Sequence, residues 1–424
     1  MFLENLYCYL GVALNISNLN LRVYVFLLYV YIVNISNIVT TVESYSIIFY
    51  LRFVFFILLV VFMFIVVYKR VNILFSVVPL CTLFLYNYYL ISIHEVDMLF
   101  SDSINFMLII FGVVVITFTF GKKDDSSDVE RLIIFGLYLF FGFSLILLFI
   151  SGGVSIEMPP KFNLTYGSLL IGREETYSLG LSNFYGLMAI VFLYSYYKRY
   201  SNDYVLVFFS IFSLYLCMLG GARGEFLITV SILCTLVVYY NLSVTKLLFI
   251  VVVFSILVSL FFLNFDEIVS SDQFTSNILL KRMELLLSGD FSSRDTLINN
   301  ALELFYETPI CFIAGCGIGF FQYYNDFPLS LYPHNFLIEM LVSFGILLST
   351  SLLIIMLLGW LLFVKRTGGG ILSLIFVYSF LVSLKSGSMM TSWFVFSVIM
   401  FFNCYFIAAA IQKSFNPSLG NAQD

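Results

Sequence analysis

The chain has 424 residues, of which 61% are hydrophobic, 19% are aromatic and only 11% are charged. An ordinary soluble domain carries about 25% charged residues, so this chain lacks the polar side chains needed to cover a water-exposed surface. Its formal net charge of -5 is small for its length and indicates no nucleic-acid partner. The composition therefore excludes a soluble protein and predicts an integral membrane protein.

The apolar residues come in blocks of about twenty, the length at which an α-helix crosses about 30 Å of hydrocarbon. A transmembrane barrel would instead alternate apolar and polar residues over about ten positions. We therefore predict an all-α, polytopic membrane protein with about 12 transmembrane helices and one long loop that contains short helices. The predicted spanning segments are, in chain order, 21–39, 47–68, 72–92, 104–121, 131–151, 182–198, 203–220, 224–241, 246–264, 336–364, 370–385 and 391–411.

Lysine and arginine residues gather in the short joints on one side of this predicted bundle. The positive-inside rule assigns that side to the cytoplasm, which also places both ends of the chain there. The basic joints begin at Lys69, Lys122, Lys198, Lys246, Lys365 and Lys413. The loops expected on the outer side are 93–103, 152–181, 220–223, 265–335 and 386–390.

One outer loop is far longer than the others and divides the chain. The predicted organisation is nine transmembrane helices in 1–264, the long outer loop in 265–335, three more helices in 336–411 and a cytoplasmic tail in 412–424. Within the loop, Ile278 to Leu287 has the pattern of an amphipathic helix on the membrane surface. Ser292 and Asp295 have the form of a capping box, so a second helix is expected that ends at Pro309.

The same loop holds two cysteines and three spaced glycines. Cys311 and Cys316 would form a disulfide only in an oxidising compartment, and their pairing stays open at this point. Gly315, Gly317 and Gly319 resemble part of a dinucleotide loop, but no strand precedes them, so a flexible elbow is the better interpretation. No pair of outer carboxylates has metal-binding spacing, and we expect no metal and no cofactor.

Three outward positions carry candidate chemistry, and the first is Arg223. It lies in Gly-Gly-Ala-Arg-Gly-Glu, residues 220–225, at the outer junction of two predicted helices. The paired glycines allow the backbone a tight turn close to a ligand. The alternative is an arginine that extends its charged end to the lipid headgroups, as is common at helix ends.

The second position is Arg294, in the first turn of the predicted loop helix. There its guanidinium and the free backbone N–H groups would point to the same place, which suits a phosphate. Lys281 and Arg282 lie on the preceding predicted helix. A basic face toward the headgroups is the favoured interpretation of Lys281, and the role of Arg282 stays open.

The third position is His334, in Pro-His-Asn at residues 333–335, where the long loop returns to the membrane. A histidine can take up a proton near neutral pH. An isolated histidine is more often a hydrogen-bonded structural residue, and we expect that role for His94.

Taken in order, these features resemble the bacterial O-antigen ligase and polymerase superfamily, in which many spanning helices flank one long periplasmic loop. Three segments carry the resemblance. The family's arginine turn is similar to Leu219 to Phe226. Its loop signature, an arginine, a helix, a proline and a glycine-rich elbow, is similar to Ser293 to Gly319. Its closing histidine-asparagine motif is similar to His334 to Gly345. The resemblance covers about residues 180–365, and Ser182-Asn183 stands where the family often has a Pro-Asn pair.

The resemblance implies an enzyme that transfers a glycan from undecaprenyl diphosphate, without a metal, at the periplasmic face of the inner membrane. Arg223 and Arg294 would stabilise the charge on the diphosphate leaving group. His334 would take the proton of the acceptor hydroxyl, and Glu339 or Glu225 would orient the imidazole or replace it. The residues expected to contact substrate are Arg282, Arg173, Asn335, Glu339 and Glu225.

Within the superfamily, we favour O-antigen polymerase, because chains this rich in Phe and Tyr with a divergent first half resemble polymerases. One alternative is a ligase that moves finished polymer to lipid A core. Another, from a different class, is a flippase for lipid-linked oligosaccharides, which would require more ionisable residues in mid-helix and clearer internal symmetry. The expected partners are undecaprenyl-diphosphate-linked glycans, membrane lipid and a chain-length regulator.

Overall fold

The architecture was obtained as a computed structural model. It describes residues 26–27, 82–83, 85–94, 109–110, 112–117, 119–120, 126–150, 179–198, 204–219, 222–241, 294–327, 332–388 and 392–415. All regular structure in these ranges is helical, and none of the residues described there is in a strand. For this part of the chain the all-α prediction is confirmed.

The chain divides into two compact units, and each is described by itself. Unit 1 comprises 1–33, 50–133 and 293–424, and unit 2 comprises 34–49 and 134–292.

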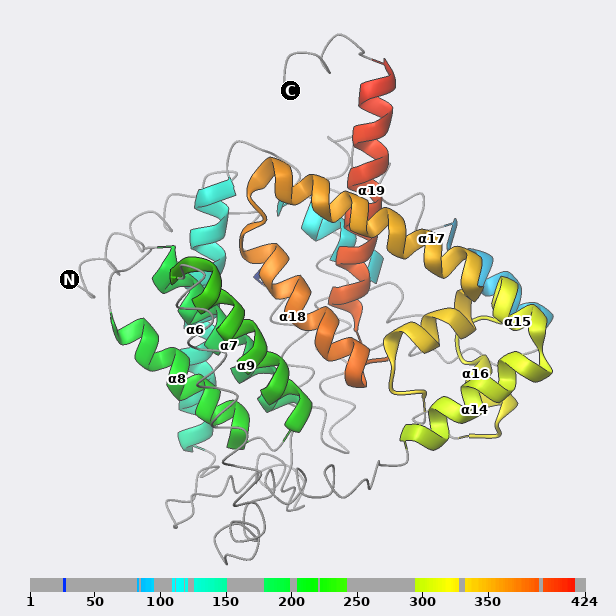
Figure 1. The fold of residues 1–424 in the computed structure, drawn as a ribbon, viewed down its shortest axis with the longest axis horizontal. Helices are drawn as coiled ribbons and strands as arrows, with labels where there is room; N and C mark the ends of the chain where they lie inside the picture. Colours follow the sequence, from blue (N-terminus) through cyan, green and yellow to red (C-terminus); the bar gives the residue numbers. More distant parts are fainter. Residues whose placement is uncertain are drawn as a thin grey trace, which may run out of the picture. The chain divides into compact units, whose positions relative to one another are not determined.

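Unit 2 contains most of α6 and three further helices, drawn from cyan to green in Figure 1. Their bounds are α6 Ser126–Ile150, α7 Leu179–Tyr197, α8 Tyr204–Leu219 and α9 Arg223–Asn241. Helix α7 packs against both α8 and α9 and is buried along most of its length. A helix that is apolar on all sides is stable only when surrounded, and α7 has that composition. The ring of Phe192 on α7 lies 4.9 Å from that of Phe141 on α6 and 5.5 Å from that of Phe209 on α8, measured between centroids.

Unit 1 contains three short helices of the long loop and the three helices that follow it. Their bounds are α14 Arg294–Glu307, α15 Pro309–Ala314, α16 Phe320–Tyr324, α17 Phe336–Thr367, α18 Gly370–Ser386 and α19 Trp393–Phe415. Helix α17 packs against α15, α18 and α19. The approach to α19 is close, because a Cβ at Gly359 would overlap the backbone of Phe402. Asn403 on α19 also donates a hydrogen bond from Nδ2 to the carbonyl oxygen of Leu352, at 3.0 Å.

Helix α17 is broken near its start, and Figure 1 shows the bend. Gly345 has φ 72° and ψ 171°, a conformation outside the helical region that glycine adopts without a steric penalty. The break separates a short first segment, residues 336–344, from the long apolar part of the helix.

Seven predicted spanning segments coincide with described helices, with ends that differ by a few residues. They are 131–151, 182–198, 203–220, 224–241, 336–364, 370–385 and 391–411, which match α6, α7, α8, α9, α17, α18 and α19. Among the described residues, two stretches are long and apolar enough to cross a membrane, Asp128–Ile146 and Phe336–Thr367, and four shorter apolar helices accompany them. The segments 47–68 and 246–264, and nearly all of 21–39, lie outside the described residues, so the count of twelve stays a prediction.

Candidate functional site

The arginine turn of unit 2 lies between two helices, as the sequence predicts, and its two glycines lie outside the described residues. Helix α8 ends at Leu219 and α9 begins at Arg223, so three residues connect two antiparallel neighbours. Ala222, just before the arginine, is buried at 1% exposure. Arg223 is the first residue of α9, and the course of its side chain lies outside the described residues. As the first helical residue, it stands beside backbone N–H groups that have no partner within the helix.

Ser182 holds this turn in place from the neighbouring helix α7. Its hydroxyl donates to the carbonyl oxygen of Cys217 near the end of α8, at 3.0 Å, and accepts from the backbone N–H of Ala222, at 3.3 Å. The side chain is fully buried. One hydroxyl thus joins the end of α8 to the residue that precedes Arg223. The sequence shows Ser182 only as a departure from the family's Pro-Asn pair, and gives no sign of this role.

Glu225, two residues after Arg223, lies in the first turn of α9 and is buried at 1% exposure. A carboxylate in this position interacts favourably with the positive end of the helix dipole. The hydroxyl of Thr229, one turn later, donates to the backbone carbonyl of Glu225 at 2.7 Å. This burial favours an orienting role for Glu225 over that of a base open to solvent.

In unit 1, the predicted loop helix is confirmed as α14, and Arg294 is its first residue. Its core-facing side consists of Leu297, Ala301 and Leu304, which are buried at 5%, 0% and 0% exposure. The side chain of Arg294 lies outside the described residues, as do Arg282, Arg173 and the predicted surface helix at 278–287. Helix α14 ends at Glu307, two residues before Pro309, as expected if this proline stops the helix, and Pro309 begins α15.

The glycine elbow, residues 314–319, joins α15 to α16. Gly315, Gly317 and Gly319 have φ values of 86°, 90° and 86°, which favour glycine over any residue with a side chain. The elbow is not the flexible segment that the sequence predicted. Its backbone N–H groups at Cys316 and Gly317 donate to the carbonyl oxygens of Val342 and Ser343, at 2.9 Å and 3.1 Å. These bonds dock it on α17.

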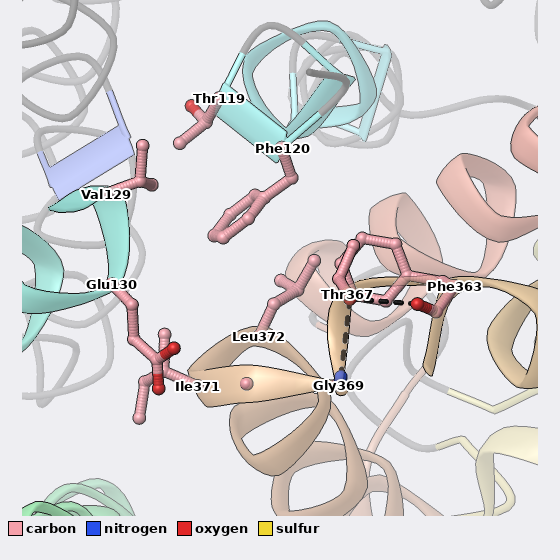
Figure 2. Close-up of a pocket in the computed structure, with 10 residues that line it drawn as sticks. Thr119, Phe120, Val129, Glu130, Phe363, Thr367, Gly369, Ile371 and Leu372 are labelled. Atoms are coloured by element: carbon pink, nitrogen blue, oxygen red, sulfur yellow. Dashed lines mark hydrogen bonds between the residues drawn. The ribbon is translucent and has the colours of Figure 1, made fainter. Parts of the chain in front are cut away.

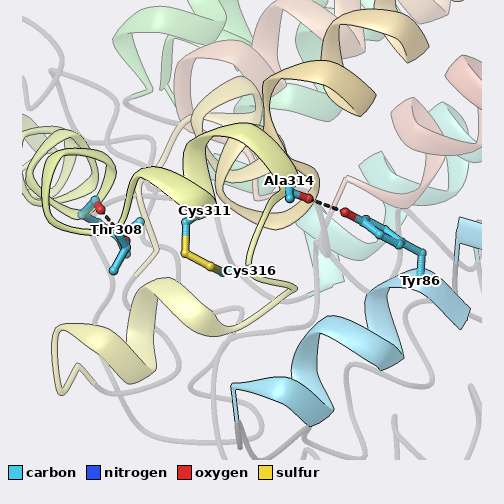
Figure 3. Close-up of a disulfide and its surroundings, with 6 residues drawn as sticks. Tyr86, Thr308, Cys311, Ala314 and Cys316 are labelled. Atoms are coloured by element: carbon cyan, nitrogen blue, oxygen red, sulfur yellow. Dashed lines mark hydrogen bonds between the residues drawn. A yellow bond between two sulfur atoms is a disulfide. The ribbon is translucent and has the colours of Figure 1, made fainter.

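A disulfide lies within the elbow region, and one segment far away in the sequence, residues 85–94, also contacts it. Figure 3 shows the disulfide between Cys311 and Cys316, whose Cα atoms are 4.9 Å apart, and the hydrogen bond from the hydroxyl of Tyr86 to the carbonyl oxygen of Ala314, at 2.5 Å. The bridge settles the pairing that the sequence leaves open. His94 lies beside it, with potential ligand atoms of the three residues within 4.8 Å of one another. The sequence gives no reason to connect His94 with this loop.

The histidine motif lies directly before α17. His334 has φ 51°, which is uncommon for a residue with a side chain, and its ring centroid is 4.1 Å from that of Tyr332. Asn335 is the N-cap of α17, and its Oδ1 accepts from the backbone N–H groups of Leu337 and Ile338, at 3.0 Å and 3.2 Å. Its Oδ1 thus has a structural role, while contact of Asn335 with substrate stays a prediction.

Glu339 occupies the first turn of α17, one turn after Asn335, and is 8% exposed. Its Oε1 accepts a hydrogen bond from the hydroxyl of Ser388, at 3.0 Å, just after the end of α18. A buried carboxylate needs such donors. Ser388, whose role has no sign in the sequence, therefore helps to fix the carboxylate nearest the histidine motif.

The predicted site residues thus fall into two groups. Unit 1 brings His334, Asn335 and Glu339 together at the start of α17, and α14, which begins at Arg294, packs against α17. Unit 2 carries Arg223 and Glu225 at the start of α9. Arg294 in unit 1 and Arg223 in unit 2 are each the first residue of a helix, where backbone N–H groups without an intrahelical partner favour an anionic ligand.

A small pocket lies at the opposite end of α17, and Figure 2 shows it. Its walls come from residues 119–120, 129–130, 363, 367 and 369–372. The long part of α17 from Gly345 to Thr367 separates it from the elbow by about 33 Å. Its lining residue Thr367 directly follows Lys365 and Arg366 in the sequence, at the predicted cytoplasmic end of α17, and none of the predicted site residues whose side chains the structure describes lines it. It is therefore not the candidate site.

Comparison with known families adds one finding. No curated protein and no solved structure matches the chain significantly. Residues 208–353, about a third of the chain, match a family model described as O-antigen ligase. The matched segment contains Arg223, Arg294 and His334 with the elements that carry them. The match supports membership of the chain in the O-antigen ligase/polymerase superfamily.

Proposed function

We propose that this chain is an O-antigen polymerase that joins undecaprenyl-diphosphate-linked oligosaccharide units at the periplasmic face of the bacterial inner membrane. The observation that carries the proposal is the family match over residues 208–353, which spans both arginine-bearing helix starts and the histidine motif. The disulfide in the long loop supports the periplasmic side, because disulfides persist in oxidising compartments.

The proposed reaction exchanges one bond for another. The bond between the anomeric carbon of the donor glycan and the diphosphate oxygen breaks, and the diphosphate leaves with the electron pair. A hydroxyl of the acceptor unit forms the new glycosidic bond, and its proton passes to the imidazole of His334. The cleavage places negative charge on the leaving group, which is where a fixed cation contributes most.

Arg223 and Arg294 are the proposed source of that positive charge. Each is the first residue of a helix, so the guanidinium and the helix N-terminus would act on the same anion. This charge stabilisation would need no metal. Glu339, held by Ser388, would orient His334 or accept the proton in its place, and Glu225 would serve the same purpose near Arg223. Arg282, Arg173 and Asn335 remain proposed contacts to the glycan or the diphosphate.

A ligase is the second candidate, because the matching family model is described as O-antigen ligase. Both enzymes would use the same donor chemistry and differ in the acceptor. A polymerase would take a lipid-linked unit as acceptor and work with a chain-length regulator. A ligase would take lipid A core.

Deletion of the gene, followed by gel analysis of the lipopolysaccharide, separates these functions. Loss of a polymerase leaves core that carries a single repeat unit, and the wild-type gene restores the ladder. Bare core, with long polymer still on the lipid carrier, would identify a ligase instead. Bare core with unpolymerised units retained on the cytoplasmic side would identify a flippase. An unchanged ladder would contradict all three.

A further inference from the structure

The first segment of α17, residues 336–344, is separated from the rest of the helix by the break at Gly345. A break in a helix removes intrahelical donors from the carbonyl groups that precede it. At this break, the carbonyl oxygens of Val342 and Ser343 accept hydrogen bonds from the backbone of the glycine elbow. The elbow thus takes the place of the missing helical turn.

The elbow and the break fit together through two glycines. A Cβ on Gly315 would lie 2.5 Å from the carbonyl oxygen of Ser343, and a Cβ on Gly345 would lie 2.5 Å from the backbone nitrogen of Gly315. Both residues have positive φ values. The two backbones are therefore in direct contact, and the position of the 336–344 segment depends on the conformation of the elbow.

The disulfide fixes that conformation. Cys311 lies on α15 and Cys316 within the elbow, and both are fully buried among apolar side chains of α14, α16 and α17. Helical residues 85–93 hold the same elbow from another side, because Asn87 Oδ1 accepts from the backbone N–H of Ile318, at 2.8 Å. The ring of His94 lies 4.7 Å from that of Phe320, at the start of α16.

The segment held in this way begins with the proposed reactive groups. His334 and Asn335 immediately precede it, and Glu339 lies within it. We propose that the Cys311–Cys316 disulfide is a positioning device for the polymerase reaction, which locks the elbow on the broken end of α17 and so fixes His334 and Glu339. The positioning role in the reaction rests on the proposed function, whereas the disulfide's hold on the elbow and on the start of α17 does not.

Formation of the lock requires an electron acceptor. The two thiols release two protons and two electrons to the disulfide of a periplasmic thiol oxidant, which becomes a dithiol by exchange. The cysteines and His94 also have the chemistry of a three-ligand site for zinc, in which both thiolates would be needed as ligands. A disulfide and such a site exclude each other, so the test separates them.

The first measurement counts thiols and metal in a variant in which Cys8, Cys81, Cys217, Cys234 and Cys404 are replaced by alanine. The purified, denatured protein is treated with maleimide-polyethylene glycol, with and without prior reduction. We expect no labelled cysteine before reduction and two afterwards. Two reactive thiols before reduction, with or without zinc in the protein, would overturn the proposal.

The second measurement follows amide hydrogen exchange in the folded protein before reduction, after reduction and after reoxidation. We expect at least tenfold faster exchange in residues 336–344 on reduction, with reversal on reoxidation and no change in α18. In the C311S/C316S double variant, residues 336–344 should exchange as fast as in the reduced protein, and the reductant should not change that rate. Unchanged exchange in 336–344 would overturn the lock, whatever the protein's activity.

The third measurement is elongation of lipid-linked repeat units by the same samples. We expect the maximal rate to fall at least fivefold on reduction and to recover on reoxidation, while C234S behaves as wild type. Redox-dependent exchange with an unchanged rate would overturn the positioning role. If exchange depends on the redox state but neither state elongates the substrate, the proposed function is wrong and the disulfide still fixes the elbow. The proposed positioning role in the polymerase reaction is then also wrong.

Discussion

The buried hydroxyl of Ser182 on α7 fixes the backbone on both sides of the arginine turn. Ser182 is both donor and acceptor in this turn, and removal of its oxygen leaves the Cys217 carbonyl and the Ala222 N–H without this partner. Loss of a buried hydrogen-bond partner costs about 1–3 kcal/mol. The substitution would therefore destabilise the backbone at Ala222, which immediately precedes Arg223.

We therefore expect Ser182→Ala to lower the thermal midpoint of the purified protein and to reduce polymer formation about tenfold, which corresponds to about 1.4 kcal/mol. Ser195→Ala is the matched control, since Ser195 is equally buried on α7 but donates to Val191 within its own helix. A control variant that loses as much activity as Ser182→Ala would contradict the proposed role of the turn.

Ser388 has a similar role at the histidine motif, because its hydroxyl donates to the carboxylate of Glu339. A hydrogen bond to a charged group is worth about 1.5–3 kcal/mol. We predict that Ser388→Ala slows elongation about tenfold and that Ser388→Thr, which keeps the hydroxyl, largely restores it. The control is Thr350→Ala, because the exposed Thr350 hydroxyl bonds only to carbonyls of its own helix among the contacts described. Equal rates for alanine and threonine at 388 would show that the hydroxyl has no such function.

At the scale of the elements, the broken helix α17 and the glycine elbow form one structural unit. We expect Gly315→Ala and Gly345→Ala each to destabilise the protein by more than 2 kcal/mol, because each Cβ would overlap backbone atoms at a positive φ. The thermal midpoint of the purified protein measures this. Gly142→Ala in α6 is the control, since a Cβ there has no atom within 4 Å, and alanine favours the helix by about 1 kcal/mol. A stable Gly345→Ala variant would mean that the elbow does not lie against the break.

The helices could be predicted from the sequence, whereas the elbow could not. Apolar blocks of about twenty residues define α6, α17 and α19, and the capping pattern at Ser292 and Asp295 locates α14. The elbow depends on contacts between residues that are 228 and 231 positions apart, from Tyr86 to Ala314 and from Asn87 to Ile318. Local periodicity contains no information about such pairs, so the elbow was predicted to be flexible and His94 unrelated to it.

The candidate site was predictable to a similar degree. The sequence predicts Arg294 in the first turn of a helix, Arg223 in the loop just before a helix and His334 just before α17, because each motif accompanies a helix boundary. The roles of Ser182 and Ser388 could not be predicted, since a buried serine has no distinguishing sequence pattern and its role depends on the neighbouring element.

The proposed topology of the whole chain requires α14 to face the periplasm and the end of α17 to face the cytoplasm. Tyr306 on α14 is 89% exposed, so a cysteine there should be readily labelled. We predict that Tyr306→Cys in intact spheroplasts reacts with a membrane-impermeant maleimide, while Lys365→Cys reacts only after permeabilisation. The opposite pattern would invert the orientation and exclude a periplasmic site on this loop.

The most direct test of the central claim is elongation by the purified protein in EDTA, with lipid-linked repeat units as the substrate. We expect elongation by wild type and a loss of about 10²–10³-fold in Arg223→Ala, Arg294→Ala and His334→Ala, as for other groups that stabilise charge or move a proton in the transition state. Arg366→Ala, at the cytoplasmic end of α17, should retain the wild-type rate. Variants of the three residues that elongate as fast as wild type, or a wild-type protein that requires added metal, would contradict it.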